Sequence, residues 1–194
     1  VYIAVVTSIE FDHGDIYKDL GEIETAFQRL LRQISGEGLA LLCADNHALS
    51  LRTHAFSRVE TYGLEARADW RAAMKPPSNG ILTLEIWHRE TRWGELTPSL
   101  FGRHNMQNTL AAVAVAATLG MGVADIAAAV RDFPGVRRRL EVFLETDSTV
   151  FVDDFAHHPT AIRETIAAAR RKTNRPSCRR PQVSFGGGLR SEQT

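Results

Sequence analysis

Two short apolar runs with an amphipathic segment between them place the tightest limit on how this chain can fold. The runs, IAVVTS at residues 3–8 and LALLCA at residues 39–44, lack the polar alternation of a half-exposed strand and fit buried strands. Between them, residues 19–34 carry apolar side chains at helical spacing: Ile23, Ala26, Phe27, Leu30, Leu31 and Ile34. Strand, helix and strand in this order predict a βαβ unit, and therefore an α/β fold with a mainly parallel sheet.

The middle of the chain predicts smaller strands followed by two helices. Residues 57–102 contain short segments of alternating character, including a hairpin around Arg89–Gly94. An Ala-rich segment at residues 105–119 and a second periodic segment at residues 123–132 predict helices that flank the sheet.

A Pro-Gly pair in FPGVRRRLE interrupts the pattern and marks a domain boundary. After it, residues 149–152, 159–171 and 182–185 predict strand, helix and strand, the beginning of a second, Rossmann-like unit. We therefore expect one domain at residues 1–133 and the start of another at residues 134–194.

Composition excludes several classes of protein. Lys plus Arg is 23 and Asp plus Glu is 23, so the zero formal charge argues against a dedicated nucleic-acid or anionic-membrane binder. No run of 18 apolar residues or amino-terminal signal is present, and the two cysteines are far apart, which predicts a reduced, cytoplasmic protein. The chain opens directly in a strand pattern without an initiator Met, so we expect a fragment of a longer protein.

Ionisable side chains gather directly after the first predicted strand, in SIEFDHGD. Glu10, Asp12, His13 and Asp15 follow the carboxyl end of that strand, where open α/β sheets bind ligands. These groups could hold a cation or form an acidic loop that leads into the helix, and residue types alone do not separate the two. Because Mg²⁺ prefers oxygen ligands, His13 by itself would not indicate magnesium.

The stretch GRHNMQN contains His104, Asn105 and Asn108 at the start of the second predicted helix. The two asparagines are three residues apart, which brings their side chains to neighbouring positions on the helix surface. Their amides could read the edge of a heterocycle. The alternative is that Asn105 simply caps the helix.

Three consecutive arginines, Arg137, Arg138 and Arg139, follow the Pro-Gly break. Consecutive side chains cannot all face one way, so at most two of them could share a ligand. The guanidinium fork suits phosphate, and a solvated basic loop fits equally well.

Asp153, Asp154, His157 and His158 lie in VDDFAHHPTAI, between a predicted strand and a predicted helix. Pro159 stands where the first residue of that helix belongs, so the backbone donors of the helix point towards this turn and favour an anion. No thiolate lies nearby, which argues against a Cys–His zinc site.

The order of these motifs resembles the Mur ligase family, the ATP-dependent amide-bond-forming enzymes of peptidoglycan synthesis. The resemblance covers residues 3–173 through DH-x-D, GRHNMQNTLAA, RRRLE and DDFAHHPTAI. Within the family, SIEFDHGDIY and the Phe of DDFAHHP resemble murein peptide ligase, which joins UDP-N-acetylmuramate to the tripeptide L-alanyl-γ-D-glutamyl-meso-diaminopimelate in cell-wall recycling. The alternative is UDP-N-acetylmuramate–L-alanine ligase, whose branch shares DDFAHHPTAI. The implied fold is part of the central domain of the family followed by the start of its Rossmann-like carboxy-terminal domain.

The resemblance also implies cofactors and residue roles. The implied cofactors are ATP and Mg²⁺, with activation of the muramate carboxylate as an acyl-phosphate. His13 would help to bind the metal and, with Arg139, would act in catalysis. The implied nucleotide contacts are His104, Asn105 and Asn108 near adenine, Arg139 at the phosphates, Asp154 near the ribose, and His157 and His158 along the same cleft.

One departure limits what this stretch can do alone. The family's phosphate loop, G-x-x-G-K-[ST], is absent from these residues. We therefore expect the 194-residue chain to have no ligase or ATPase activity by itself. A second hypothesis is a non-catalytic nucleotide-binding α/β module that kept the adenine side and lost the phosphate loop.

Overall fold

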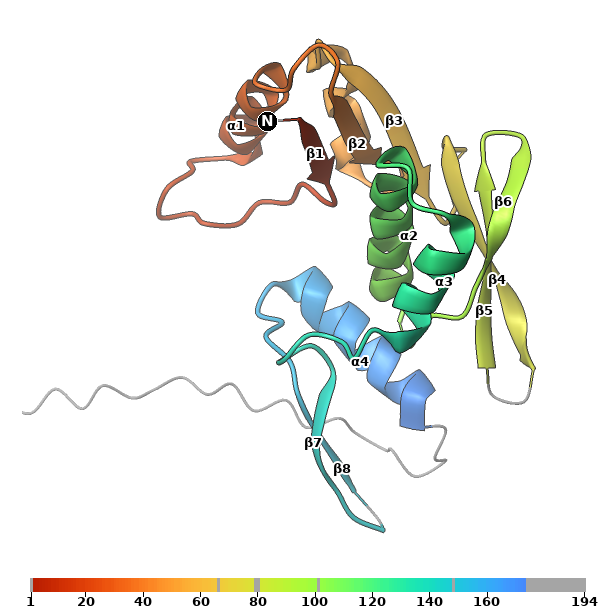
Figure 1. Cartoon of the computed structure of the whole chain (residues 1–194). Coiled ribbons are helices and arrows are strands. Elements are labelled where there is room, and N and C mark those ends of the chain that lie inside the picture. Colours follow the sequence, from red (N-terminus) through yellow and green to blue (C-terminus); the bar gives the residue numbers. More distant parts are fainter. Residues whose placement is uncertain (1, 66, 79–80, 101, 148, 174–194) are drawn as a thin grey trace, which may run out of the picture.

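The computed structural model describes residues 2–65, 67–78, 81–100, 102–147 and 149–173 (Figure 1). In chain order the elements are β1 (Ile3–Val6), α1 (Leu20–Arg32), β2 (Leu39–Cys43), the 3₁₀ helix η1 (His47–His54), β3 (Arg58–Gly63), β4 (Trp70–Ser78), β5 (Ile81–His88), β6 (Thr91–Leu96), α2 (Arg103–Thr118), α3 (Val123–Asp132), β7 (Glu141–Glu145), β8 (Val150–Asp153) and α4 (Pro159–Thr173).

The strands β1 to β6 form one sheet in sequence order. The pairs from β1 to β4 are parallel, whereas β5 and β6 continue the sheet as an antiparallel ribbon. All five residues of β2 are buried, so both faces of this strand are covered, as its apolar sequence predicts. The α/β fold with a mainly parallel sheet and flanking helices is confirmed.

The helices pack on the sheet through the apolar positions identified in the sequence. In α1, Ile23 and Leu31 are buried, and the carboxylate of Asp19 caps the helix by accepting from the backbone N–H of Glu22 at 3.1 Å. The helix α2 contacts β3 and β4, and α3 lies beside α2 against β6 (Figure 1). Met106 and Leu110 of α2 are completely buried in the resulting core.

The predicted hairpin around Arg89–Gly94 is present as β5 and β6. Arg89 adopts a left-handed backbone conformation with φ of 54° at the turn. Pairing of Trp87 with Arg92 follows a register irregularity after Ile86. The 3₁₀ helix η1 was not predicted.

After α3 the chain forms a second, separate sheet, in which β7 and β8 are antiparallel, followed by α4. The Pro-Gly break lies between the two sheets, although the division into domains at 133 and 134 stays a prediction. The strand β7 was not predicted, and the strand expected at 182–185 lies outside the described residues. Only Leu140 and Ala168 are buried apolar residues among those described after Asp132.

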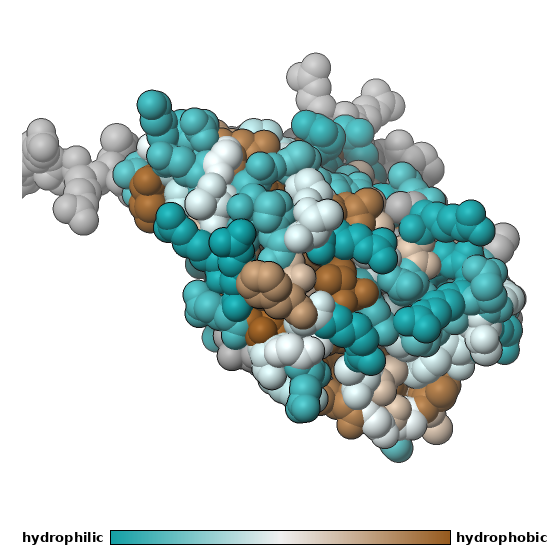
Figure 2. Space-filling model, turned by 90° about the horizontal axis from the view of Figure 1, so that it is seen from above, coloured by the Kyte–Doolittle hydropathy of each residue, from teal (hydrophilic) through white to brown (hydrophobic). Residues whose placement is uncertain are grey.

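The surface seen from above the view of Figure 1 is mostly hydrophilic, with hydrophobic residues in small, scattered groups (Figure 2). Scattered apolar residues are normal on a globular protein and indicate no site by themselves. None of the described helices is long and apolar enough to cross a membrane.

Candidate functional site

The loop after β1 carries the first predicted group. His13 has a left-handed backbone with φ of 55°, and its N–H donates to Asp12 Oδ1 at 2.8 Å. This hydrogen bond is the main reason that the pKa of the Asp12 carboxyl is lowered. The His13 side chain is exposed. The described residues contain no group of three His, Cys, Asp or Glu side chains that could hold a metal ion, and the metal role of His13 stays a prediction.

The turn between β8 and α4 is organised around Asp154, whose side chain is 9% exposed. Its Oδ2 accepts from the backbone N–H of Leu140 at 2.9 Å, and its Oδ1 accepts from the N–H of Ala156 at 2.8 Å and from the hydroxyl of Thr165 at 3.3 Å. Both oxygens therefore hold the turn together. A ribose contact by Asp154 stays a prediction, and it would have to be added to these hydrogen bonds.

Glu10 joins the loop after β1 to the amino-terminal end of α4. Its Oε2 accepts from the hydroxyl of Thr160 at 2.6 Å and lies 3.3 Å from Nδ1 of His158. Beside it, Nε2 of His157 lies 3.8 Å from Oδ2 of Asp12. Two predicted groups that are about 150 positions apart in the chain are therefore neighbours in space.

The third group lies at the amino-terminal end of α2. Gly102, with φ of 98°, is the N-cap residue, and no side chain caps the helix. The alternative interpretation of Asn105 as the N-cap is therefore wrong. Asn105 is 8% exposed within the first turn, whereas Asn108 is exposed. The two asparagines thus differ in access to any ligand on the surface of the protein.

His104 belongs to the first turn of α2. A methyl group built on Gly102 would come within 2.7 Å of Cβ of Ala168 and 3.0 Å of Cε1 of His104, which shows how closely the start of α2 approaches α4 (Figure 1). Nδ1 of His104 is buried and has no hydrogen-bond partner within the described part of the chain. Burial lowers the pKa of this imidazole, while Glu164 and Asp154 act in the opposite direction.

The three arginines after the Pro-Gly break have different surroundings. Arg138 has a left-handed backbone, its N–H donates to Glu141 at 2.7 Å, and its guanidinium lies 4.9 Å from the centre of the Phe155 ring. Arg139 is half exposed, and its Nη1 lies 4.0 Å from Oδ1 of Asp154, which is a loose ion pair. Arg137 is exposed. The guanidinium of Arg139 is thus accessible to a phosphate.

Sequence reasoning missed Asp45, which follows the carboxyl end of β2. Its carboxylate is 1% exposed, accepts from the N–H of Leu64 at 2.7 Å and from Nε2 of Gln107 at 2.8 Å, and lies 3.5 Å from Arg103. It thereby holds the first turns of α2 against the sheet. The signal was available, because Asp45 and the His13 loop follow parallel neighbouring strands and so meet at one edge of the sheet.

The start of α2 approaches α4 at Ala168, whereas the loop after β1 contacts the amino-terminal end of α4 at Thr160. Together with the turn before α4, these segments bring amides, imidazoles and a guanidinium to this helix. Amides can pair with a heterocycle, and a guanidinium can pair with phosphate. The buried, unpartnered Nδ1 of His104 leaves a polar atom for a ligand or water to satisfy. This donor set fits a nucleotide.

Comparison with known proteins identifies a matching family. Residues 1–116 match the family described as the Mur ligase middle domain. The UDP-N-acetylmuramate–L-alanine ligase of Geotalea uraniireducens (strain Rf4) is 41% identical over 169 residues, which cover 87% of this chain and 37% of that protein. The chain therefore spans 37% of the length of this curated relative.

Solved structures show the same fold. The UDP-N-acetylmuramate–alanine ligase of Thermotoga maritima is 26% identical with a TM-score of 0.70, over 87% of this chain and 38% of that one. A murein peptide ligase from Psychrobacter arcticus 273-4 is 28% identical with a TM-score of 0.63, over 88% and 35%. A MurF ligase of Thermotoga maritima in complex with ADP has a TM-score of 0.68 over 86% and 38%, and at 19% identity it shares the fold alone.

Proposed function

Because the chain belongs to the Mur ligase family through its middle domain, we propose that it forms the nucleotide side of an ATP-dependent ligase that joins UDP-N-acetylmuramate to L-alanine. The observation that supports the nucleotide assignment is the approach of three segments to α4, through Glu10 at Thr160, Asp154 at Thr165 and Gly102 at Ala168. The 41% identity to an L-alanine ligase supports the choice of amino acid.

A murein tripeptide is the second candidate for the amine substrate. It was the leading interpretation of SIEFDHGDIY, and the similarity to a murein peptide ligase structure is a reason to test it. The curated relative favours L-alanine, so the tripeptide takes second place here.

Each residue of the proposed site is given a task that its surroundings permit. Asn105, Asn108 and His104 would hold the adenine end of ATP. Arg139, whose guanidinium is half exposed, would meet the phosphates, and His157 and His158 would line the same side. ATP, when bound, supplies the phosphoryl group that activates a carboxylate. His13 would help to hold Mg²⁺ beside the phosphates, and we assign no step to the metal.

The substrate proposal is tested with the full-length protein that contains this chain. Phosphate release is measured with UDP-N-acetylmuramate and ATP, in the presence of either L-alanine or L-alanyl-γ-D-glutamyl-meso-diaminopimelate. We expect turnover with L-alanine. Faster turnover with the tripeptide would reassign the substrate, and turnover with neither would favour the non-catalytic nucleotide-binding module.

The role of Arg139 is tested in the same protein by Arg139→Ala, with Arg137→Ala as the matched control, since Arg137 is an exposed neighbour in the same run. A guanidinium that meets charge in the transition state should affect kcat more than the KM for ATP, by roughly 10²-fold or more. Unchanged kinetics in a folded Arg139→Ala protein would end the phosphate assignment.

A further inference from the structure

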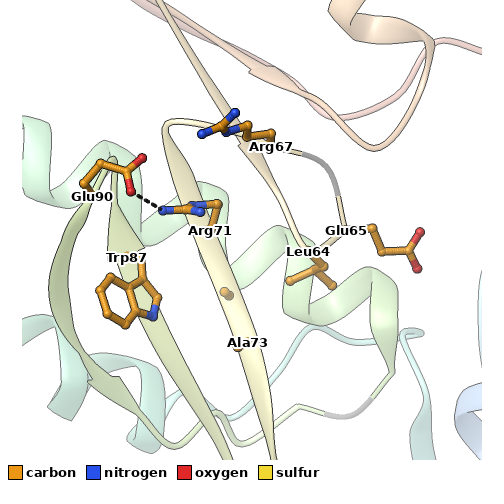
Figure 3. A pocket seen from close by; sticks show the side chains of 8 residues that line it. Leu64, Glu65, Arg67, Arg71, Ala73, Trp87 and Glu90 are labelled. Atoms are coloured by element: carbon orange, nitrogen blue, oxygen red, sulfur yellow. Dashed lines mark ion pairs between the residues drawn. The ribbon is translucent and has the colours of Figure 1, made fainter.

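A hollow of about 550 Å³ lies on the antiparallel side of the sheet, away from the proposed nucleotide site (Figure 3). It is open to solvent and is bounded by the stretch after β3 and by the strands β4 and β5. The lining residues are Leu64, Glu65, Arg67, Arg71, Ala72, Ala73, Trp87 and Glu90. None of them belongs to the proposed nucleotide site. We refer to it as the arginine hollow.

The floor of the arginine hollow follows from strand register. Arg71 of β4 and Trp87 of β5 are directly opposite each other, so both side chains lie on the same face of the ribbon. The buried residues Leu84 and Ile86 belong to the core, and Trp87 alternates with Ile86, so it points to the other face. The ring of Trp87 therefore provides a half-buried apolar surface next to a guanidinium.

The guanidinium of Arg71 is incompletely paired. Its Nη2 donates to the backbone carbonyl of Arg89 at 2.5 Å, while its Nε is buried and has no hydrogen-bond partner among the residues that the structure describes. The carboxylate of Glu90 is 3.9 Å away, and its side chain is 87% exposed (Figure 3). A buried arginine nitrogen without a partner is unfavourable, and the charge of Arg71 has only a loose counterion.

The charges around the arginine hollow are balanced in number but loosely paired, with Arg67 and Arg71 against Glu65 and Glu90. Arg67 is exposed and makes no ion pair with the described residues. Glu65 points away from both arginines (Figure 3), and its carboxylate lies 3.1 Å from Arg103 of α2. Glu90 is therefore the lining carboxylate beside Arg71, at 3.9 Å.

A smaller hollow of about 200 Å³ shares Arg67 and Glu90 with the first and adds Arg52 and Arg89. Its second acidic residue, Asp69, accepts from the N–H and the hydroxyl of Thr61, both at 2.9 Å, and lies 3.7 Å from Nε of Arg89. Four arginines thus surround two adjoining depressions.

Arg92, on the same ribbon, shows what a fully paired arginine looks like in this protein. Its Nε lies 2.8 Å from Glu85 and its Nη2 lies 2.7 Å from Glu95. Arg92 thus has two close carboxylate partners, whereas Arg71 has one carboxylate at 3.9 Å and Arg67 makes no ion pair with the described residues. Donors of Arg67 and Arg71 are therefore available to a negatively charged ligand.

We propose that the arginine hollow binds a small organic anion. Arg67 and Arg71 would hold its phosphate or carboxylate group, and its carbon skeleton would lie against Trp87 and Leu64. Guanidinium groups pair with both kinds of oxyanion, so the shared chemistry is an oxyanion on an apolar body. Neither the adenine side of the proposed site nor its catalytic arginine takes part, so this site is independent of the proposed ligase function.

The test is a titration of the 194-residue chain, followed by tryptophan fluorescence, with inorganic pyrophosphate in one arm and citrate in the other. We expect a saturable change in fluorescence in at least one arm, and the arm that responds identifies the class of oxyanion. Trp87→Phe should abolish the fluorescence change, while calorimetry should still detect binding.

The arginines are tested by Arg71→Met and Arg67→Met, with Arg92→Met as the matched control. Loss of one charged hydrogen bond should weaken binding by about tenfold or more in the first two variants, and Arg92→Met should bind within about twofold of the original chain. Arg67 is exposed, so its variant is expected to fold even if Arg71→Met does not. A linear response in both arms, or equal losses in all three variants, would overturn the proposal.

Discussion

The strands β2 and β7 both contain five residues, yet they are stabilised in different ways. Every residue of β2 is buried, with Leu41 and Leu42 at 0% exposure. In β7, Phe143 is 65% exposed and Leu144 is 49% exposed. The first strand lies between β1 and β3 in a packed six-stranded sheet, whereas the second belongs to a two-stranded ribbon, which is marginally stable by itself.

The difference shows that the two parts of the chain depend on different forces. Apolar burial stabilises the six-stranded sheet. The segment from β7 to α4 depends instead on the Asp154 carboxylate, on Glu10 and on the close packing of Ala168 at Gly102. Four sets of substitutions test this difference. They change a leucine in each strand, two neighbouring aspartates, Glu10 and His104.

The largest effect is expected from Leu41→Ala. Removing a fully buried leucine should lower the free energy of unfolding by about 2–5 kcal/mol, measured by urea denaturation. Leu144→Ala is the matched control and should change it by about 0.5 kcal/mol or less. Similar losses in both variants would show that β7 is packed as tightly as β2.

Asp154→Ala should have the next largest effect, confined to the second part of the chain. It removes the acceptor for two backbone N–H groups, which should cost about 1–3 kcal/mol. Hydrogen exchange at Leu140 and Ala156 should accelerate, while exchange in β2 stays unchanged. The control is Asp153→Ala, because Asp153 is 47% exposed and lies 3.5 Å from Arg138 in a single ion pair. Uniform acceleration throughout the chain would contradict a local role.

Glu10→Ala should destabilise the amino-terminal end of α4, with a smaller effect than that of Asp154→Ala. Its hydrogen bond and ion pair are partly exposed, so their loss should cost roughly 1 kcal/mol or less. Hydrogen exchange in the first turns of α4 is the measurement. Asp15→Ala removes an exposed carboxylate from the same loop and serves as the control. The idea fails if both variants leave α4 equally protected.

The smallest effect is expected from pH acting on His104. Burial lowers the pKa of this imidazole below its unfolded value of about 6.5, so the folded state resists protonation. The unfolded chain then binds more protons as the pH falls, and the stability present above about pH 6.5 should decrease below it. Urea midpoints at about pH 7.5 and 5.5 should therefore differ more for the unmodified chain than for His104→Gln. Parallel decreases in the two proteins would rule out His104 as the cause.

The sequence allowed the parallel strands and the helices to be predicted where periodicity or apolar runs are long. The helix at 19–34 has six apolar positions at regular spacing, and the observed helix spans Leu20–Arg32. Shorter elements escaped prediction: β7 has mixed exposure and η1 has no clear apolar face. The local sequence pattern carries little information about a short strand such as β7, because such a strand forms only by pairing with its partner.

The candidate site was predicted as a set of residues but not as a set of contacts. The resemblance to the family supplied His13, Asn105, Arg139 and the turn at Asp154. It could not indicate that Glu10 contacts Thr160 or that Asp154 holds the backbone of Leu140, because such contacts join segments distant in sequence. Asp45 was missed because a single aspartate after a strand is common, and its burial depends on α2.

Gly102 has a consequence for how sequences of this kind can change over time. Its φ of 98° and the 2.7 Å that would separate an added methyl group from Cβ of Ala168 both require the absence of a side chain. If Gly102 were replaced, a further mutation of Ala168 to glycine would relieve the contact but not the backbone strain. The second mutation would therefore not fully compensate for the first. Gly102 has no side chain and yet cannot be replaced without strain. Its neighbour in α4, Ala168, can become smaller but not larger.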